Sequence, residues 1–268
     1  RSALGESLGM LEARLGLRLL RRPTRSGTTA GAGARLLATV APRLQEIDLE
    51  LGSLTALRDK PAGTVRITAH DHAITTALWP RLMPLLQRYP DVQIEFSVDY
   101  AMTDIAAQRF DAGVRTGNRV DKDMIAVPIA PELRMAVAAS PAYLEGKRLP
   151  KTPQDLTQHR CINLRLPTHG GLYAWDFEKK GQALNVRVPG QATFNNTYLM
   201  LQAALDGMGF AYVPWDIVAP HVGAGRLVSV LEDWCPTFPG YHLYYANRRQ
   251  IAPALALVVE ALRYRKPG

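Results

Sequence analysis

The chain has 268 residues, of which 47% are apolar. This length suits two or three compact units, and the apolar content is enough to build their cores, which excludes an intrinsically disordered chain. The formal net charge is +8, and residues 1–35 account for +5 of it, with seven arginines against two acids. A basic end of this kind favours a module that binds phosphates over a uniformly basic enzyme surface.

The two cysteines, Cys161 and Cys235, are too few for a disulfide framework, so we expect a reducing compartment. The first residues show no apolar stretch before a cleavage site, so we expect no signal peptide. No run approaches the roughly 18 apolar residues that a membrane-spanning helix needs. These features together predict a cytoplasmic protein with no membrane partner.

The N-terminal residues predict a short helix followed by a basic connection. Leucines recur 4, 3 and 4 residues apart over residues 2–15, which places them on one face of a helix. Residues 17–20 form a short apolar run, and residues 21–33 are basic and rich in turn-forming residues.

A longer apolar repeat predicts a helix over residues 32–58. Its apolar residues follow the 3, 4 spacing of a coiled-coil seam, and they are Leu37, Val40, Leu44, Ile47, Leu51 and Leu54. Pro42 lies inside this helix and is expected to kink it or to destabilise it by about 3 kcal/mol. Because a lone helix must bury such a seam, we expect it to pair with a second copy; packing on the chain's own globular domain is the alternative.

Beyond the helix breaker at residues 60–63, the pattern alternates between strands and helices. The expected strands are residues 64–69, 92–98, 111–115, 124–129, 134–139, 210–213 and 242–247. The expected helices are residues 72–88, 101–109, 197–206 and 252–264, with one more beginning at Ser140-Pro141, and residues 235–240 are expected to form a loop. Alternation of this kind predicts an α/β fold with a parallel sheet.

Taken in order, these features closely resemble the LysR-type transcriptional regulators. The segments that carry the resemblance are residues 2–26, Ala32-Gly33, GTVRI (63–67), DAGVRTG (111–117), SPAYL (140–144), the DL…HRCI run (155–162), the GxGxxxxP segment (207–214) and AGRLV (224–228). The resemblance covers essentially the whole chain. It also implies that the family's first helix and the helix before the recognition helix are absent, so we expect an N-terminally truncated helix-turn-helix.

The resemblance implies a domain organisation. Residues 1–31 would form a partial winged helix-turn-helix, residues 32–60 a dimerising linker helix, and residues 61–268 an effector-binding domain. This last domain would have the two-lobed, type 2 periplasmic-binding-protein-like fold, with lobe I in residues 63–131 and 240–268 and lobe II in residues 132–239. The implied function is a transcription regulator that binds double-stranded promoter DNA as a homodimer or homotetramer and is switched by a small molecule.

Candidate DNA-binding residues follow from the geometry of a recognition helix, whose N-terminal side chains meet base edges in the major groove. The expected base contacts are Ser2, Ala3, Glu6 and Ser7. Contacts to phosphates or to the minor groove are expected from Arg21, Arg22, Arg25 and Ser26. The alternatives are a solvated basic loop for the arginines and a helix-capping carboxylate for Glu6.

Candidate effector-binding residues are those at strand ends and helix N-termini, where ligands of open α/β sheets bind. They are Thr68, Ala69, His70 and Asp71 after the first strand, Ser97 and Asp99 after the second, Thr116 after the third, and Phe194, Asn195, Asn196, Tyr212 and Pro214 from the second lobe. Hydroxyls and helix-end amides suit a carboxylate, which makes a carboxylate one candidate effector class. An ordinary strand-end or capping role is the alternative for each residue.

The sequence contains no phosphate loop, nucleophile elbow or HExxH motif, so we expect no enzyme, cofactor or metal site. Two other functions stay open for the same fold. One is a solute-binding protein of a transporter, which the arginine-rich front end disfavours. The other is an α/β enzyme, for which turnover that depends on His70 or Asp71 would be the sign.

Overall fold

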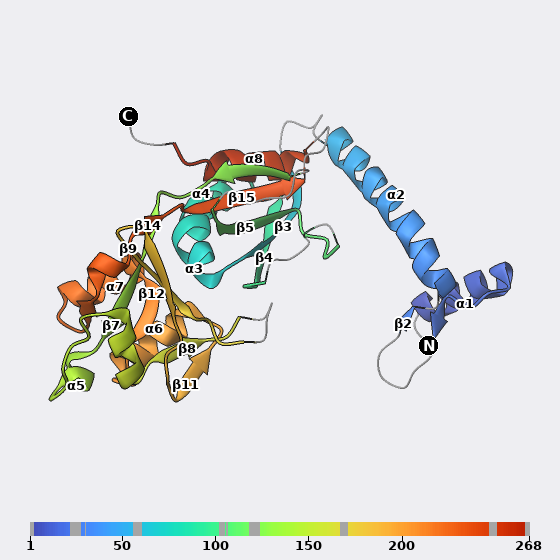
Figure 1. Cartoon of the computed structure of the whole chain (residues 1–268). Helices are drawn as coiled ribbons and strands as arrows, with labels where there is room; N and C mark the ends of the chain where they lie inside the picture. The colour runs from blue at the N-terminus through green and yellow to red at the C-terminus, as the bar shows by residue number, and fades with distance from the viewer. Residues whose placement is uncertain are drawn as a thin grey trace. The chain divides into compact units, whose positions relative to one another are not determined.

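The computed structural model describes residues 3–21, 28–29, 31–55, 61–101, 105, 107–117, 124–166, 171–246 and 251–265. The chain divides into two compact units, residues 1–59 and residues 60–268. Figure 1 shows each unit, with its helices and strands labelled where there is room.

The described part of the first unit consists of two helices with a short antiparallel strand pair between them. α1 (Ala3–Leu15) ends at Gly16, whose φ of +64° lies in the left-handed region that glycine adopts readily. β1 (Leu20–Arg21) pairs with β2 (Thr28–Thr29), so the basic connection contains a small hairpin. Between α1 and β1, the backbone N–H of Leu19 donates to Glu12 Oε1 at 2.7 Å, and the Leu19 side chain is buried.

α2 (Gly31–Thr55) begins against this connection. A Cβ on Gly33 would lie 2.0 Å from the backbone carbonyl oxygen of Leu19, which is far inside van der Waals contact. Only glycine therefore allows the first turn of α2 to approach the chain at Leu19 this closely.

The predicted seam of α2 is exposed within its own unit. The helix continues through Pro42. Apolar seam side chains are solvent-accessible, with Leu37 exposed by 52%, Leu44 by 55% and Ile47 by 54%. At these positions the seam is therefore not buried within the first unit; the side chains of Leu51 and Leu54 lie outside the described residues.

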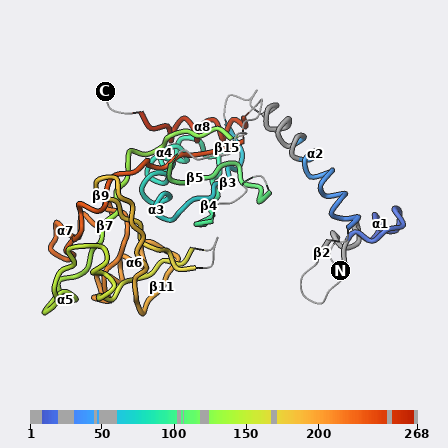
Figure 2. Tube along the Cα trace, viewed as in Figure 1, coloured from blue at the N-terminus to red at the C-terminus, as the bar shows by residue number. Residues whose placement is uncertain are grey.

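Lobe I of the second unit is built on a sheet with the strand order β4-β3-β5-β15-β6. The strands are β3 (Gly63–Ala69), β4 (Val92–Val98), β5 (Ala112–Thr116), β6 (Met124–Pro128) and β15 (Tyr241–Ala246). β3 is parallel to β4 and β5, but β15 is antiparallel to both β5 and β6. The expected parallel sheet is therefore mixed, because the chain returns from lobe II before it adds β15 (Figure 2).

Helices complete the core of lobe I. α3 (Asp71–Ala73), the π-helical turn η1 (Ile74–Leu78) and α4 (Trp79–Arg88) follow one another without a break, and α8 (Pro253–Leu262) contacts α4. The buried face includes Leu78 and Leu82 from the first helical run and Val258 and Leu262 from α8, packed with Ile67 of β3.

The helix predicted over residues 101–109 is wrong at the positions that the structure describes. Ala101 lies in a bend, and Ile105 and residues 107–109 lie in turns. One contact and one backbone angle explain the difference. The carbonyl oxygen of Ala101 accepts from the Arg115 guanidinium, and Arg109 adopts a φ of +59°, which no α-helix accommodates.

Lobe II is built around β7 (Leu133–Ala139), which pairs antiparallel with β12 (Ala211–Pro214), β13 (Val228–Val230) and β14 (Thr237–Phe238). Alternate β7 residues face two different apolar clusters, so the sheet is covered on both sides. β14 lies inside the predicted loop at residues 235–240, which is therefore partly a strand.

The other elements of lobe II surround this sheet. The helical ones are α5 (Pro141–Leu144), η2 (Pro153–Gln158), α6 (Thr197–Leu205), α7 (Trp215–Gly223) and η3 (Glu232–Trp234). β8 (Ile162–Leu164) pairs parallel with β11 (Ala192–Phe194), and β9 (Trp175–Lys179) forms an antiparallel hairpin with β10 (Gln182–Val186). The cores of the two lobes are separate, so the second unit is two-lobed, as the sequence predicts.

Candidate effector cavity and interlobe network

A cavity of about 560 Å³ lies between the lobes, a volume in the range of small-molecule sites. Lobe I contributes residues from the ends of β3 and β5 and from β15. Lobe II contributes residues from β7, from the β9–β10 hairpin and from β12. The cavity therefore opens where both lobes can contact one occupant.

The structure brings some of the predicted effector residues to this cavity and not others. The lining residues among them are His70, Thr116, Tyr212 and Pro214. Those that do not line it, all within the described residues, are Thr68, Ala69, Asp71, Ser97, Asp99, Phe194, Asn195 and Asn196. Thr68 and Ala69 are fully buried in lobe I, and Asn196 instead caps α6 by accepting from the Leu199 N–H at 2.9 Å.

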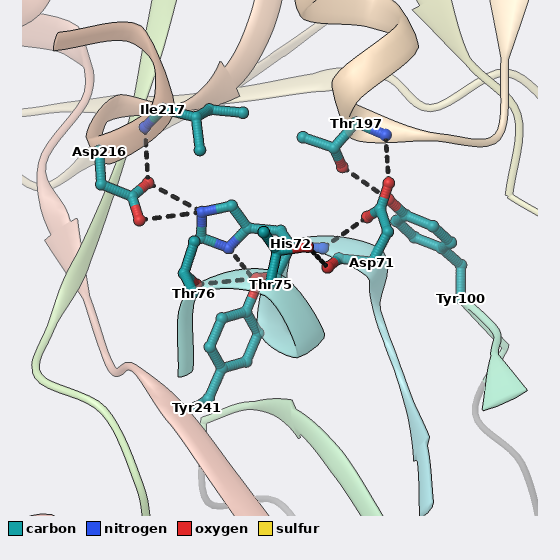
Figure 3. A network of polar contacts seen from close by, with 9 residues as sticks. All are labelled: Asp71, His72, Thr75, Thr76, Tyr100, Thr197, Asp216, Ile217 and Tyr241. Carbon is teal, nitrogen blue, oxygen red and sulfur yellow. Dashed lines mark hydrogen bonds and ion pairs between the residues drawn. The ribbon is translucent and has the colours of Figure 1, made fainter. Parts of the chain in front are cut away.

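Asp71 connects the two lobes rather than facing the cavity. Its Oδ2 accepts from the backbone N–H of Thr197, the first residue of α6, at 2.7 Å (Figure 3). Its Oδ1 accepts from the His72 N–H at 2.7 Å and from the Tyr100 hydroxyl. The N-terminus of α6, which sequence reasoning offered to a ligand carboxylate, therefore already binds a carboxylate of the chain itself.

A second bridge runs through His72. Its Nε2 lies 2.8 Å from Asp216 Oδ1 of α7, and its Nδ1 lies 2.9 Å from the Tyr241 hydroxyl of β15. Because an ionised carboxylate can only accept, Nε2 carries a proton. Burial raises the pKa of the Tyr241 hydroxyl well above its ordinary value, so this hydroxyl keeps its proton. Figure 3 shows both bridges meeting at α3.

Two threonines in η1 support this bridge. The hydroxyls of Thr75 and Thr76 donate to the backbone carbonyls of Asp71 and His72, at 3.0 and 2.8 Å. Single π-helical turns often occur at functional sites, and this one directly follows the two residues that reach lobe II.

Aromatic rings form much of the cavity wall. His70 stacks on Tyr100 with ring centroids 4.6 Å apart, and Tyr212 stacks on the buried Trp175 at 5.3 Å. Burial, together with the charge of Arg115, lowers the pKa of His70 to about 4, so its ring is neutral at physiological pH. The aromatic part of the wall is therefore uncharged, because the His70 ring is neutral and the tyrosine hydroxyls keep their protons.

Arg115 is the buried cation of the lobe I wall. Its guanidinium donates to the carbonyl oxygens of Ala101, Thr68 and Val114, and to the Thr68 hydroxyl. Burial lowers the pKa of Arg115, an effect that the nearby Asp99 partly opposes. The guanidinium therefore carries a positive charge, but its N–H donors already bind oxygens of the chain.

The β9–β10 hairpin forms an acidic part of the lobe II wall. Asp176 and Glu178 alternate with the buried Trp175 and Phe177 along β9, so both carboxylates lie on the same strand face. Across the hairpin, Asp176 pairs with Asn185, which also lines the cavity.

Asp176 sits in crowded surroundings although part of its side chain is exposed. Desolvation raises the pKa of its carboxyl, and the Tyr173 hydroxyl donates to its Oδ1. The raised pKa reflects a carboxyl group that protein atoms partly shield from water.

Sequence reasoning missed several lining residues. Tyr100, Arg115, Asp176 and Tyr241 are examples. A signal existed for Asp176, because WDFEK (175–179) and QALNV (182–186) flank a Lys180-Gly181 turn, which is typical of a hairpin. Arg115 lies inside a predicted strand, where a charged side chain signals a buried partner or a site.

The candidate DNA-binding residues fall mostly at the N-terminus. Ala3, Glu6 and Ser7 lie in the first two turns of α1, and Arg21 lies in β1. Ser2, Arg22, Arg25 and Ser26 lie outside the described residues. Exposed basic side chains elsewhere in the described part of this unit are Arg14, Arg18, Arg35 and Arg43.

Comparison with known proteins matches this architecture. The family model of the LysR substrate binding domain matches residues 58–266. A putative transcriptional regulator of Pseudomonas aeruginosa is 56% identical over 99% of this chain and 87% of its own length. The HTH-type transcriptional regulator PgrR of Escherichia coli is 42% identical over 98% of this chain and 88% of its own length.

Solved structures show the same fold. The full-length virulence activator AphB of Vibrio cholerae, an LTTR family member, superposes with a TM-score of 0.71 at 23% identity, covering 97% of this chain and 88% of that one. CrgA, a LysR-type transcriptional regulator from Neisseria meningitidis, superposes with a TM-score of 0.63 at 22% identity, covering 97% and 89%.

The fold and the cavity thus define a two-lobed sensor domain that follows a helical N-terminal unit. The family match and the sequence identities identify the particular family: the chain belongs to the LysR-type transcriptional regulators. The expected fold class and regulatory function are confirmed at this level. Within the described residues, no helix is long and apolar enough to cross a membrane, and no cluster of three or more potential metal ligands occurs.

Proposed function

We propose that this regulator binds promoter DNA through its first unit, as a dimer or tetramer, and that a small molecule in the interlobe cavity switches its activity in the cytoplasm. The observation that carries the proposal is the cavity of about 560 Å³ whose walls come from both lobes. A ligand that contacts both walls stabilises one lobe arrangement over others, which is the differential binding that a switch requires.

The interlobe bridges support this proposal. Asp71 reaches Thr197 and His72 reaches Asp216, so each bridge joins α3 to a helix N-terminus of lobe II beside the cavity. A ligand that shifts either helix would lengthen these hydrogen bonds. The bridges are therefore a direct physical link between occupancy of the cavity and the angle between the lobes.

Support for oligomerisation comes from α2. Its exposed apolar seam, with Leu37, Val40, Leu44 and Ile47, follows the spacing of a two-stranded coiled coil. We propose that the seam pairs with the same seam of a second copy, which would bring two DNA-binding units to two half-sites.

For DNA contact, we propose Ser2, Ala3, Glu6 and Ser7 at the major groove and Arg21, Arg22, Arg25 and Ser26 at the backbone or the minor groove. The positive charge of residues 1–35 supports this assignment. For the effector, the predicted residues that line the cavity, namely His70, Thr116, Tyr212 and Pro214, are proposed as direct contacts.

The test is gel retardation of DNA fragments from the regulator's own upstream region. We expect the chain to retard such a fragment and Arg21→Ala to weaken retardation for all sequences alike. Loss of one phosphate contact should also reduce the slope of log affinity against log salt by about 0.9. Arg148→Ala, an exposed arginine of lobe II, is the matched control and should bind as the unchanged chain does. Equal binding by Arg21→Ala would contradict the assigned role of that arginine, and no retardation of any upstream fragment would contradict DNA binding by this chain.

A further inference from the structure

Three groups at the cavity that could attract an anion, namely the α6 N-terminus, Arg115 and His72, are already used by the chain. The Thr197 N–H at the α6 N-terminus donates to Asp71. All five N–H donors of the Arg115 guanidinium point to protein oxygens, with distances between 2.6 and 3.5 Å. His72 is engaged by Asp216 and Tyr241. A ligand carboxylate would be attracted by the positive charge of Arg115. However, the N–H donors of Thr197, Arg115 and His72 already have acceptors from the chain.

The acidic groups of the cavity are in the opposite situation. Within the described part of the chain, neither Asp176 nor Glu178 takes part in an ion pair. The side chain of Asp176 accepts one hydroxyl, that of Tyr173, which leaves acceptor capacity on a carboxylate with two oxygens. Glu178 is exposed at the cavity wall. These carboxylates can therefore accept from a donor that enters the cavity.

The aromatic wall suits the same kind of occupant. The Tyr212 hydroxyl donates to the backbone carbonyl oxygen of Asp176. The Tyr212 ring therefore lies next to β9, the strand that carries Asp176 and Glu178. Phe177 packs close to Tyr212, with ring centroids 5.3 Å apart. An organic cation gains from an adjacent carboxylate, and its apolar part gains from contact with aromatic side chains, whereas the carboxylates repel an anion.

We propose that the effector is an organic cation, with a protonated amine or a similar group bound by Asp176 and Glu178 and an apolar part against Tyr212 and its neighbours. This assignment differs from the carboxylate expected from the sequence. It rests on the proposed function, because it takes the interlobe cavity as the effector site, and it names the chemical class that the cavity accepts.

The test measures binding of matched amines and carboxylates to the full chain by titration calorimetry at neutral pH. The amines are phenethylammonium, tyramine and putrescine, and their isosteric acids are 3-phenylpropanoate, 3-(4-hydroxyphenyl)propanoate and adipate. We expect at least one amine to bind at millimolar concentration or better, about tenfold or more tightly than its matched acid. We also expect Asp176→Asn and Glu178→Gln each to weaken that amine, the first by about tenfold or more.

Glu145→Gln is the matched control, because Glu145 is an exposed acid at the end of α5 that does not line the cavity. It should leave amine binding unchanged, and the melting temperature of each variant reports whether it is folded. The proposal is overturned if the acids bind more tightly than the amines, if all three amines fail to bind, or if Asp176→Asn and Glu178→Gln both bind amines as Glu145→Gln does. DNA retardation by the same preparations separates these results from a failure of DNA binding, because amine binding requires no DNA.

Discussion

The carboxylate of Asp71 at the start of α3 accepts a hydrogen bond of 2.7 Å from the backbone N–H of Thr197 at the start of α6. The two residues belong to different lobes. The negative charge thus lies at the N-terminus of the lobe II helix, where the helix dipole favours it. Thr197 also lies 2.6 Å from the Tyr100 hydroxyl, so three residues share one buried polar junction between the lobes.

Replacing Asp71 by alanine should destabilise the sensor. The backbone N–H groups of Thr197 and His72 would lose their acceptor at a position where Asp71 is 7% exposed, and an unsatisfied buried polar group costs about 1–3 kcal/mol. We expect the free energy of unfolding to fall by about 2–5 kcal/mol, measured by urea denaturation. Asp206→Ala, which removes an exposed carboxylate at the other end of α6, is the control and should change little. An Asp71→Ala chain as stable as this control would show that the bridge does not hold the lobes.

His70 should make the stability depend on pH. Burial lowers the pKa of His70 from 6.5 to about 4, so the unfolded chain binds a proton in this range that the folded chain does not. The free energy of unfolding is therefore highest above pH 6.5. It falls as the pH drops from 6.5 towards 4, by up to about 3 kcal/mol from this group.

The measurement is urea denaturation at pH 7 and pH 4.5, for the unchanged chain and for His70→Phe, which keeps a ring to stack on Tyr100. The groups whose charges bear on this titration are Arg115, Asp71, His72 and Asp99, and all of them remain in the variant. We expect the variant to lose less stability between the two pH values. Equal losses would contradict the lowered pKa of His70.

The seam of α2 should control the oligomeric state. Leu44 is 55% exposed at its centre, and a glutamate there would place a charge in the proposed helix–helix contact. We expect light scattering after gel filtration to give at least a dimer for the unchanged chain and a smaller assembly for Leu44→Glu. Ala38→Glu places the same charge on an exposed position away from the seam and should leave the assembly intact. A monomeric unchanged chain would remove the basis for pairing through α2.

The close contact between Gly33 and Leu19 should matter for the structure of the first unit and not for the stability of the sensor domain. Alanine at position 33 would bring its Cβ to 2.0 Å from a backbone oxygen, so the start of α2 must shift. We expect Gly33→Ala to reduce DNA retardation while urea denaturation of the sensor is unchanged. Gly31→Ala is matched closely, because it lies in the same helix turn with open space around its Cβ, and it should behave normally. Normal retardation by Gly33→Ala would mean that this contact does not position the DNA-binding unit.

Features with a short repeat were predictable. The leucines of α1, the seam of α2 and most strands of the second unit follow periods of 3.6, 3.5 or 2 residues, and the structure places elements at nearly the expected bounds. The strand-end rule brought His70, Thr116, Tyr212 and Pro214 to the cavity. The helix expected at residues 101–109 shows the limit of this reasoning. The Arg115 side chain, which is close in space, donates to the Ala101 carbonyl oxygen that a helix would use for its own hydrogen bond.

The amino-acid sequence by itself determined the position of the most regular helices and strands, the basic helical front, the leucine seam and the family resemblance, because each depends on residues close together along the chain. Only the tertiary structure decided which polar groups meet. Thr197 and Asp71 are 126 residues apart, and His72 and Asp216 are 144 residues apart. Their pairing depends on the order of the strands and on the return of the chain from lobe II to lobe I. That crossover sets which carboxylates are used to join the lobes and which ones, Asp176 and Glu178, are left facing the cavity.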